Sequence, residues 1–233
     1  MIAFLTPIST SAPHIYLSAL PFAPSESILW KTACSPFPKV IKVSEGRMTE
    51  WPKPLKGHLR AIIGLVYSPD SRKLVSCSFD KTVRIWDAGT GMPVGEPLKG
   101  HIGGATSVAC IAYSPDGRRF ISGSDDGTVR IWDAGTRMPV GKPLTGHTGG
   151  VRRVAWSPNG QSIVSCSGSF DPTIRIRDAA TGAPVGELLR GHLKAITSVA
   201  YSPNSRYIVS GSQDQTIRFW DAQQISSNGE YFM

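Results

Sequence analysis

Histidine, serine and aspartate, the side-chain types of nucleophilic hydrolases, recur together four times in this chain of 233 residues. In each copy a Gly-His dipeptide precedes a serine and an aspartate, and in three copies a tryptophan follows. The four sets are His58, Ser76, Asp80 and Trp86; His101, Ser122, Asp126 and Trp132; His147, Ser165 and Asp171; and His192, Ser210, Asp214 and Trp220. A second serine two positions later, such as Ser78, Ser124 or Ser212, is an alternative member.

The repetition of these sets argues against catalysis. A nucleophilic triad needs one exposed serine beside a base and an oxyanion hole, and the sequence contains no GxSxG turn. A set that is copied beside an indole is typical of a buried polar network, in which a neutral histidine donates to the aspartate and accepts at its other nitrogen. HExxH, GxxxxGK[ST] and GxGxxG are also absent. We therefore expect no catalytic residue, no cofactor and no metal site.

Two copies depart from the pattern. In the third, Arg177 replaces the tryptophan and Gly168-Ser169 is an insertion before Asp171. An arginine can supply polar contacts but not the packing of an indole, so we predict that this unit is the weakest. The second copy has three extra residues between His101 and Tyr113, which should lengthen a loop or bulge a strand.

The segments that carry these residues have the pattern of short antiparallel strands. The first copy reads LVYSPDSRKLVSCSFDKTVRIWD, with apolar runs rich in Val, Ile and Tyr separated by Pro-Asp and Ser-x-Asp turns. A fourth strand fits MPVGEPLKG. The Gly-His dipeptides follow one another at steps of 43, 46 and 45 residues. Four-stranded units of this length, stacked on one another, are the blades of an all-β propeller.

The paired Gly-His and Trp-Asp signatures over residues 51–222 resemble the WD-repeat family. The resemblance implies a propeller whose blades are each held by a hydrogen-bonded tetrad and whose function is to bind proteins as a scaffold or sensor. The PVGEPLxGH linker and the similarity among copies further resemble the C-terminal arrays of fungal NACHT-type signalling NTPases. This chain has no phosphate-binding loop, so the alternative is a truncated remnant of such a receptor without independent activity.

The remaining segments bear on how the ring closes. We expect a tail at residues 1–13, a degenerate blade at 14–50 and a C-terminal tail at 223–233. Phe22-Ala23-Pro24 aligns with Tyr201-Ser202-Pro203, although a proline-rich linker is the alternative for this segment. The chain could then be a fragment of a larger ring, a small closed ring, or half of a ring that two copies complete.

Charge and cysteine usage restrict the partners. The net charge is +8, and half of it comes from arginines at one shared position, Arg84, Arg130, Arg175 and Arg218, for which we favour ion pairs between blades. Nucleic-acid binding is not expected, because clustered Lys/Arg runs and RNP-like aromatic residues are missing. No apolar run reaches membrane-spanning length, and the N-terminus lacks the basic region of a secretory signal. The four cysteines show no metal or disulfide spacing, which favours a cytoplasmic location without excluding the nucleus.

Positions that differ between copies are the candidates for partner contacts. The residue before the tetrad aspartate is Phe79, Asp125, Phe170 or Gln213. A few residues after Gly-His, another variable position holds Ile63, Ala109, Arg152 or Thr197. Aromatic and arginine side chains are enriched at protein interfaces. We therefore predict a protein-binding patch at Ile63, Phe79, Asp125, Arg152, Phe170 and Gln213, with surface drift as the alternative.

Overall fold

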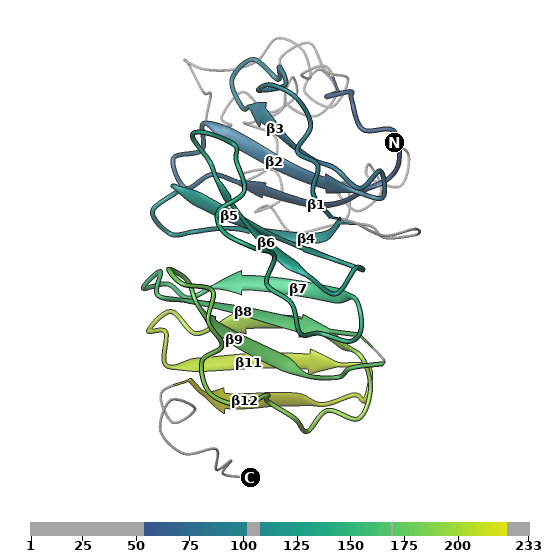
Figure 1. Ribbon diagram of the computed structural model, residues 1–233, viewed down its shortest axis with the longest axis vertical. Helices are drawn as coiled ribbons and strands as arrows, with labels where there is room; N and C mark the ends of the chain where they lie inside the picture. The colour runs from purple at the N-terminus through teal and green to yellow at the C-terminus, as the bar shows by residue number, and fades with distance from the viewer. Residues whose placement is uncertain (1–53, 102–107, 169, 223–233) are drawn as a thin grey trace, which may run out of the picture. The chain divides into compact units, whose positions relative to one another are not determined.

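The computed structural model describes residues 54–101, 108–168 and 170–222. The chain divides into two compact units, Met1–Leu55 and Lys56–Met233, and every described strand lies in the second. The strands are β1 (Ile62–Tyr67), β2 (Lys73–Ser78), β3 (Val83–Asp87), β4 (Val108–Tyr113), β5 (Arg119–Ser124), β6 (Val129–Asp133), β7 (Val151–Trp156), β8 (Ser162–Ser167), β9 (Ile174–Asp178), β10 (Ile196–Tyr201), β11 (Tyr207–Ser212) and β12 (Ile217–Asp221). They form four antiparallel sheets of three consecutive strands each (Figure 1), so the predicted all-β, blade-like architecture is confirmed.

Each sheet is a meander whose turns follow from the local sequence. Between β1 and β2, Ser68 Oγ donates to the Asp70 carboxylate at 2.6 Å, and Ser71 adopts a φ of 58°. Glycine occupies the equivalent of Ser71 in the second and third sheets, at Gly117 and Gly160. A register shift near the start of the first strand recurs in all four sheets. This bulge is therefore a property of every repeat rather than of the second alone.

The predicted fourth strand is only partly formed. After β3, the chain returns alongside this strand through bridges that pair Trp86 with Pro93 and Val83 with Leu98. The segment does not become a regular strand, because proline has no N–H to donate and Gly95 interrupts the extended backbone with a φ of 71°. The same bridges follow β6 and β9.

The cores lie between consecutive sheets. Val75 and Ile85 of the first sheet pack with Val108, Phe120 and Trp132 of the second. A similar cluster joins the second sheet to the third, and another joins the third to the fourth. These interfaces require strands that are apolar on both faces, because each middle sheet is covered by a neighbour on either side.

Several predicted segments lie outside the described residues. They are the tails at 1–13 and 223–233, the degenerate blade at 14–50, and most of the insertion in the second repeat, which falls within 102–107. In the part of the chain that is described, no helix has the length and apolarity needed to cross a membrane.

Candidate functional site

The predicted tetrad of the first sheet is a connected hydrogen-bond network. His58 precedes β1, Ser76 lies in β2, Asp80 in the β2–β3 turn and Trp86 in β3. His58 Nδ1 lies 2.8 Å from Asp80 Oδ2, and its Nε2 lies 2.7 Å from Ser76 Oγ. Trp86 Nε1 donates to the same Ser76 oxygen at 2.8 Å. The network thus ties the segment before β1 to β2, the turn and β3.

The second and fourth sheets repeat this geometry. Ser122 Oγ lies 2.8 Å from both His101 Nε2 and Trp132 Nε1, and the His101 Nδ1–Asp126 Oδ2 distance is 3.1 Å. In the fourth sheet, the His192–Asp214, His192–Ser210 and Trp220–Ser210 distances are 2.8, 2.8 and 2.9 Å. In all four sheets the earlier of the two candidate serines contacts the histidine, as Ser165 does His147. The later serine instead caps the loop, for example through Ser78 Oγ, which donates to Arg60 O at 3.1 Å.

A threonine that sequence reasoning missed completes each network. Thr82 Oγ1 donates to Asp80 Oδ1 at 2.6 Å, and the equivalent bonds are made by Thr128, Thr173 and Thr216. The signal was present in the sequence, because each tetrad aspartate is followed two residues later by a threonine. The hydroxyl and the histidine ring therefore occupy different oxygens of one carboxylate.

These bonds fix the charge states of the aspartates. Burial opposes ionisation of Asp80, but donation from Thr82, from the Leu59 N–H and from His58 outweighs it and lowers its pKa to about 2. The pKa values of Asp126, Asp171 and Asp214 are lowered by the same kinds of contact. The network is satisfied when each histidine is neutral, with its proton on Nδ1 directed to the aspartate and Nε2 accepting from the serine. The four serines of the networks are at most 1% exposed, so their hydroxyl groups are closed to a substrate.

The third sheet lacks the indole donor and uses a different arrangement. His147 still contacts Asp171 at 3.1 Å and Ser165 at 2.9 Å. Arg177, which replaces the tryptophan, is 9% exposed and donates to the backbone carbonyls of Gly182 and Thr145 instead of to the serine. Burial, together with the charges of Arg175 and Arg177, lowers the pKa of His147 although Asp171 opposes this shift.

The predicted partner-binding residues all lie toward one end of the sheets, where the second strand turns into the third and the first strand begins. Phe79 N donates to Ala61 O at 3.0 Å, and Gln213 N donates to Ala195 O at the same distance, which joins these two segments. Phe170 is 93% exposed and Phe79 is 48% exposed. Gln213 is also exposed, whereas Ile63 and Asp125 are half-buried.

One contact links two of these residues across sheets. Arg152 Nη1 lies 3.8 Å from Asp125 Oδ1, and both side chains are partly open to water, so the pair adds little stability. Ala109, which shares the strand position of Arg152, is only 6% exposed. This position therefore does not present a side chain to a partner in every repeat.

The shared arginines do not form the ion pairs that we favoured. Among the described residues none of the four guanidinium groups has a carboxylate partner. Each lies instead against the glycine of its own Gly-His dipeptide, as Arg84 does with Gly57. Arg175 Nη2 additionally donates to Gly146 O at 2.6 Å. Arg175 thus stabilises the loop that carries His147.

The described cysteines are buried strand residues. Cys77, Cys110 and Cys166 are at most 3% exposed. Burial raises the pKa of the Cys77 thiol to about 12, which keeps it protonated and unreactive at neutral pH. Within the ranges that the structure describes, no cluster of three or more His, Cys, Asp or Glu side chains is arranged to hold a metal ion.

Comparison with known proteins places the repeats in a family. The chain matches the family described as "WD domain, G-beta repeat" over residues 51–87, 91–133, 138–178 and 182–221. The vegetative incompatibility protein HET-E-1 of Podospora anserina is 41% identical over 79 residues, which are 33% of this chain and 6% of that protein. Striatin-4 of Mus musculus is 48% identical over 58 residues, 24% of this chain and 8% of the relative. The Notchless protein homolog of Arabidopsis thaliana is 35% identical over 75 residues, 32% and 13% of the two chains.

These alignments span only a small part of each relative. The match to HET-E-1 agrees with the resemblance to fungal repeat arrays. The four family segments cover well over half of the sequence and coincide with the four sheets and their tetrads. The chain therefore belongs to the WD-repeat family.

Proposed function

We propose that this chain is a non-catalytic scaffold or sensor module that binds a protein through the exposed turns at the Gly-His end of its sheets. Domains of the WD-repeat family are generally protein-interaction modules. The observation that carries the proposal is that the repeats separate their shared polar residues, which are bonded to one another, from a variable position that is exposed in three of the four. The histidine, serine and aspartate side chains are bound to one another in the network, whereas Phe79, Phe170 and Gln213 vary at one exposed position.

The proposed contact surface consists of Phe79, Arg152 and Phe170. Two exposed phenylalanines offer apolar area, and the Arg152 side chain, 56% exposed, adds a guanidinium that can pair with a partner carboxylate. A partner with an apolar segment flanked by acidic residues fits this combination.

The test compares two alanine variants of the purified chain in affinity capture followed by mass spectrometry. The first replaces Phe79, Arg152 and Phe170. The matched control replaces Met92 and Met138, which are 64% and 63% exposed and lie in the turns after β3 and β6, at the opposite end of the sheets.

We expect the triple variant to lose at least one partner that the wild type and the methionine variant both retain. Circular dichroism of all three proteins checks that the sheets are intact. Retention of every partner by the folded triple variant would remove the proposed surface.

A further inference from the structure

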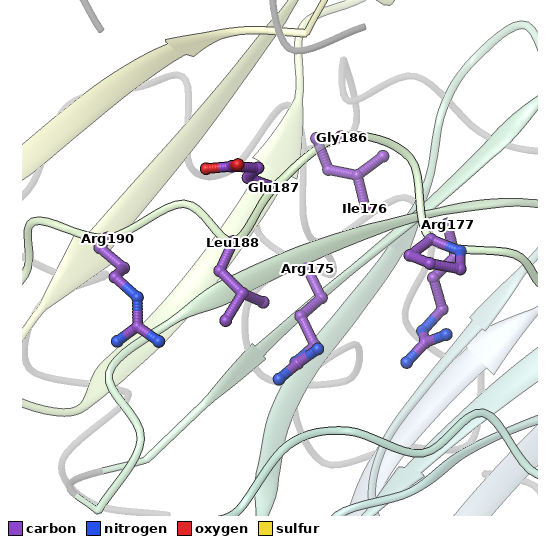
Figure 2. A pocket seen from close by; sticks show the side chains of 8 residues that line it. Arg175, Ile176, Arg177, Gly186, Glu187, Leu188 and Arg190 are labelled. Atoms are coloured by element: carbon purple, nitrogen blue, oxygen red, sulfur yellow. The ribbon is translucent and has the colours of Figure 1, made fainter. Parts of the chain in front are cut away.

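The third sheet carries a pocket that the tetrad does not account for. The pocket has a volume of about 420 Å³ and lies between β9 and the segment that returns alongside it, residues 184–190. Arg175 and Arg177 of β9 line it together with Arg190, Leu188, Pro184 and Glu187 (Figure 2). Its volume is within the range of pockets that hold small organic ligands.

The replacement of tryptophan by Arg177 changes the character of this surface. In the other sheets the indole lies against the Gly-His loop. A Cβ atom added to Gly57 would lie 3.0 Å from Trp86 Cη2, and one added to Gly100 would lie 3.1 Å from Trp132 Cη2. At Gly146 of the third sheet, Arg177 takes the place of the indole, beside Arg175, whose equivalents also lie at the other glycines. A guanidinium thus stands where an apolar ring is placed in the other repeats.

Three guanidinium groups gather at this pocket. Arg175 and Arg177 are two apart in one strand, so both lie on the same face. Figure 2 shows the guanidinium groups of Arg175, Arg177 and Arg190 directed to the same side, with Leu188 between two of them and the Glu187 carboxylate directed away. Among the described residues, no carboxylate lies within ion-pairing distance of the three. In the described part of the chain, the pocket therefore gathers three positive charges, and Glu187, which also lines it, pairs with none of them.

The arginines retain donors that a ligand could use. Arg177 gives one N–H from each terminal nitrogen to backbone carbonyls, out of five on the group. Among the described residues, Arg175 is bonded only through its Nη2, to Gly146 O, which leaves its Nη1 to donate to a ligand. Arg190 is exposed. Burial and the neighbouring Arg175 lower the pKa of Arg177, which an anion bound beside it would counteract.

We propose that this pocket binds a small organic phosphate monoester, with the phosphate held by Arg175, Arg177 and Arg190 and the organic part packed on Leu188 and Pro184. A phosphate monoester carries close to two negative charges at neutral pH and three acceptor oxygens. It can therefore accept from several guanidinium forks at once, whereas a carboxylate offers one charge and two oxygens. The apolar side chains favour an ester over inorganic phosphate.

The experiment is isothermal titration calorimetry of the full chain with phenyl phosphate at constant ionic strength and about pH 8, where the phosphate is a dianion. Inorganic phosphate, benzoate and phenol are titrated in parallel, together with a peptide containing phosphotyrosine. We expect saturable binding of one phenyl phosphate per chain, at least about tenfold tighter than that of inorganic phosphate or benzoate, and no binding of phenol.

Three variants locate the site. Arg190→Glu reverses an exposed charge and should weaken phenyl phosphate binding about tenfold or more without affecting folding. Arg177→Trp restores the residue of the other repeats and should abolish binding. Arg60→Glu, the same charge change at an exposed arginine before β1, should leave the affinity unchanged.

Several results would overturn the proposal. They are the absence of saturable phenyl phosphate binding, equal affinity for benzoate, and unchanged binding in both Arg190→Glu and Arg177→Trp. Binding of the phosphopeptide without binding of phenyl phosphate would also reject a small-molecule site in favour of a protein ligand.

Discussion

At the scale of single residues, the tetrad serine has the most demanding position. Ser76 Oγ accepts from Trp86 Nε1 and also contacts His58 Nε2, so one hydroxyl bridges two rings. Ser76 is 1% exposed and Trp86 is 2% exposed, which leaves no water to replace a lost bond. A buried polar group without a partner costs more free energy than its hydrogen bond contributes.

Ser76→Ala is therefore expected to lower the free energy of unfolding by about 1–3 kcal/mol. The loss would come from the Trp86 N–H and the His58 Nε2, which would both be left buried without a hydrogen-bond partner, because the side-chain volume changes little between serine and alanine. Urea denaturation followed by tryptophan fluorescence measures it. Ser198→Ala, in the exposed part of β10, is the control and should change stability by less than about 0.5 kcal/mol. Equal effects of the two substitutions would contradict a network role for Ser76.

The tetrad aspartates give the protein a defined acid sensitivity. Because the pKa of Asp80 is lowered to about 2 in the folded state from an ordinary value of 3.8, its contribution to stability is complete above about pH 4. The contribution is lost as the pH falls through the folded pKa. We expect the urea midpoint of the wild type to decrease steeply between about pH 4 and pH 2.

The variant Asp80→Asn separates this contribution from that of the other carboxylates. It should be less stable than the wild type at neutral pH, and the difference between the two midpoints should shrink as the pH falls toward 2. A difference that is the same at all pH values would show that ionisation of Asp80 does not stabilise the fold.

At the scale of secondary-structure elements, the third sheet differs from the others in β9 and in the turn that precedes it. Arg177 is buried in place of the indole, and Asp171 N donates to Gly168 O rather than to a serine side chain as Asp80 N does. Phe170, which follows the insertion in the sequence, is 93% exposed. This sheet thus combines an incomplete network with the basic pocket.

Arg177→Trp should stabilise the domain by about 1–2 kcal/mol, because it supplies the missing donor to Ser165 and buries an apolar ring. Differential scanning calorimetry at low phosphate concentration measures the change. Arg175→Trp, two residues earlier in β9, removes the bond to Gly146 O and should destabilise instead. If Arg177→Trp also lowers the melting temperature, the third sheet has adapted to its arginine and the prediction of a weak unit is wrong.

At the scale of the whole molecule, β12 of the fourth sheet exposes apolar side chains at positions that are buried in β3, β6 and β9. Ile217 and Phe219 of β12 are 70% and 72% exposed. The equivalent residues of β3, β6 and β9 are at most 5% exposed; they are Val83, Ile85, Val129, Ile131, Ile174 and Ile176. A bare strand face of this kind favours association with another sheet.

We expect the purified chain to self-associate through this face, as in a ring completed by two copies. Sedimentation velocity at increasing protein concentration should show a species larger than the monomer. Replacement of Ile217 and Phe219 by Lys and Glu should shift the distribution to monomer, whereas Met92→Lys with Met138→Glu should not. A wild-type chain that remains monomeric at high concentration would rule out this association.

The sequence alone determined the repeat unit, its first three strands and the histidine and aspartate of each network, because these depend on local spacing and on residues that every copy shares. The choice between the two serines of each copy, and the incomplete fourth strand, came from the structure. His58, Ser76, Asp80 and Trp86 could be grouped without coordinates since their pattern occurs in register elsewhere. The threonine that follows each aspartate was equally readable but was not used.

Only the tertiary structure decided how strongly each copy exposes its variable residues. Ala109 and Arg152 share a strand position, yet one is buried and the other open, because exposure depends on what packs against the site. The same reason applies to the arginines, which approach the Gly-His loop instead of a carboxylate on the next sheet. The pocket at Arg177 could not be predicted from the sequence. It forms between β9 and residues 184–190, and only the structure shows that these two segments enclose a space.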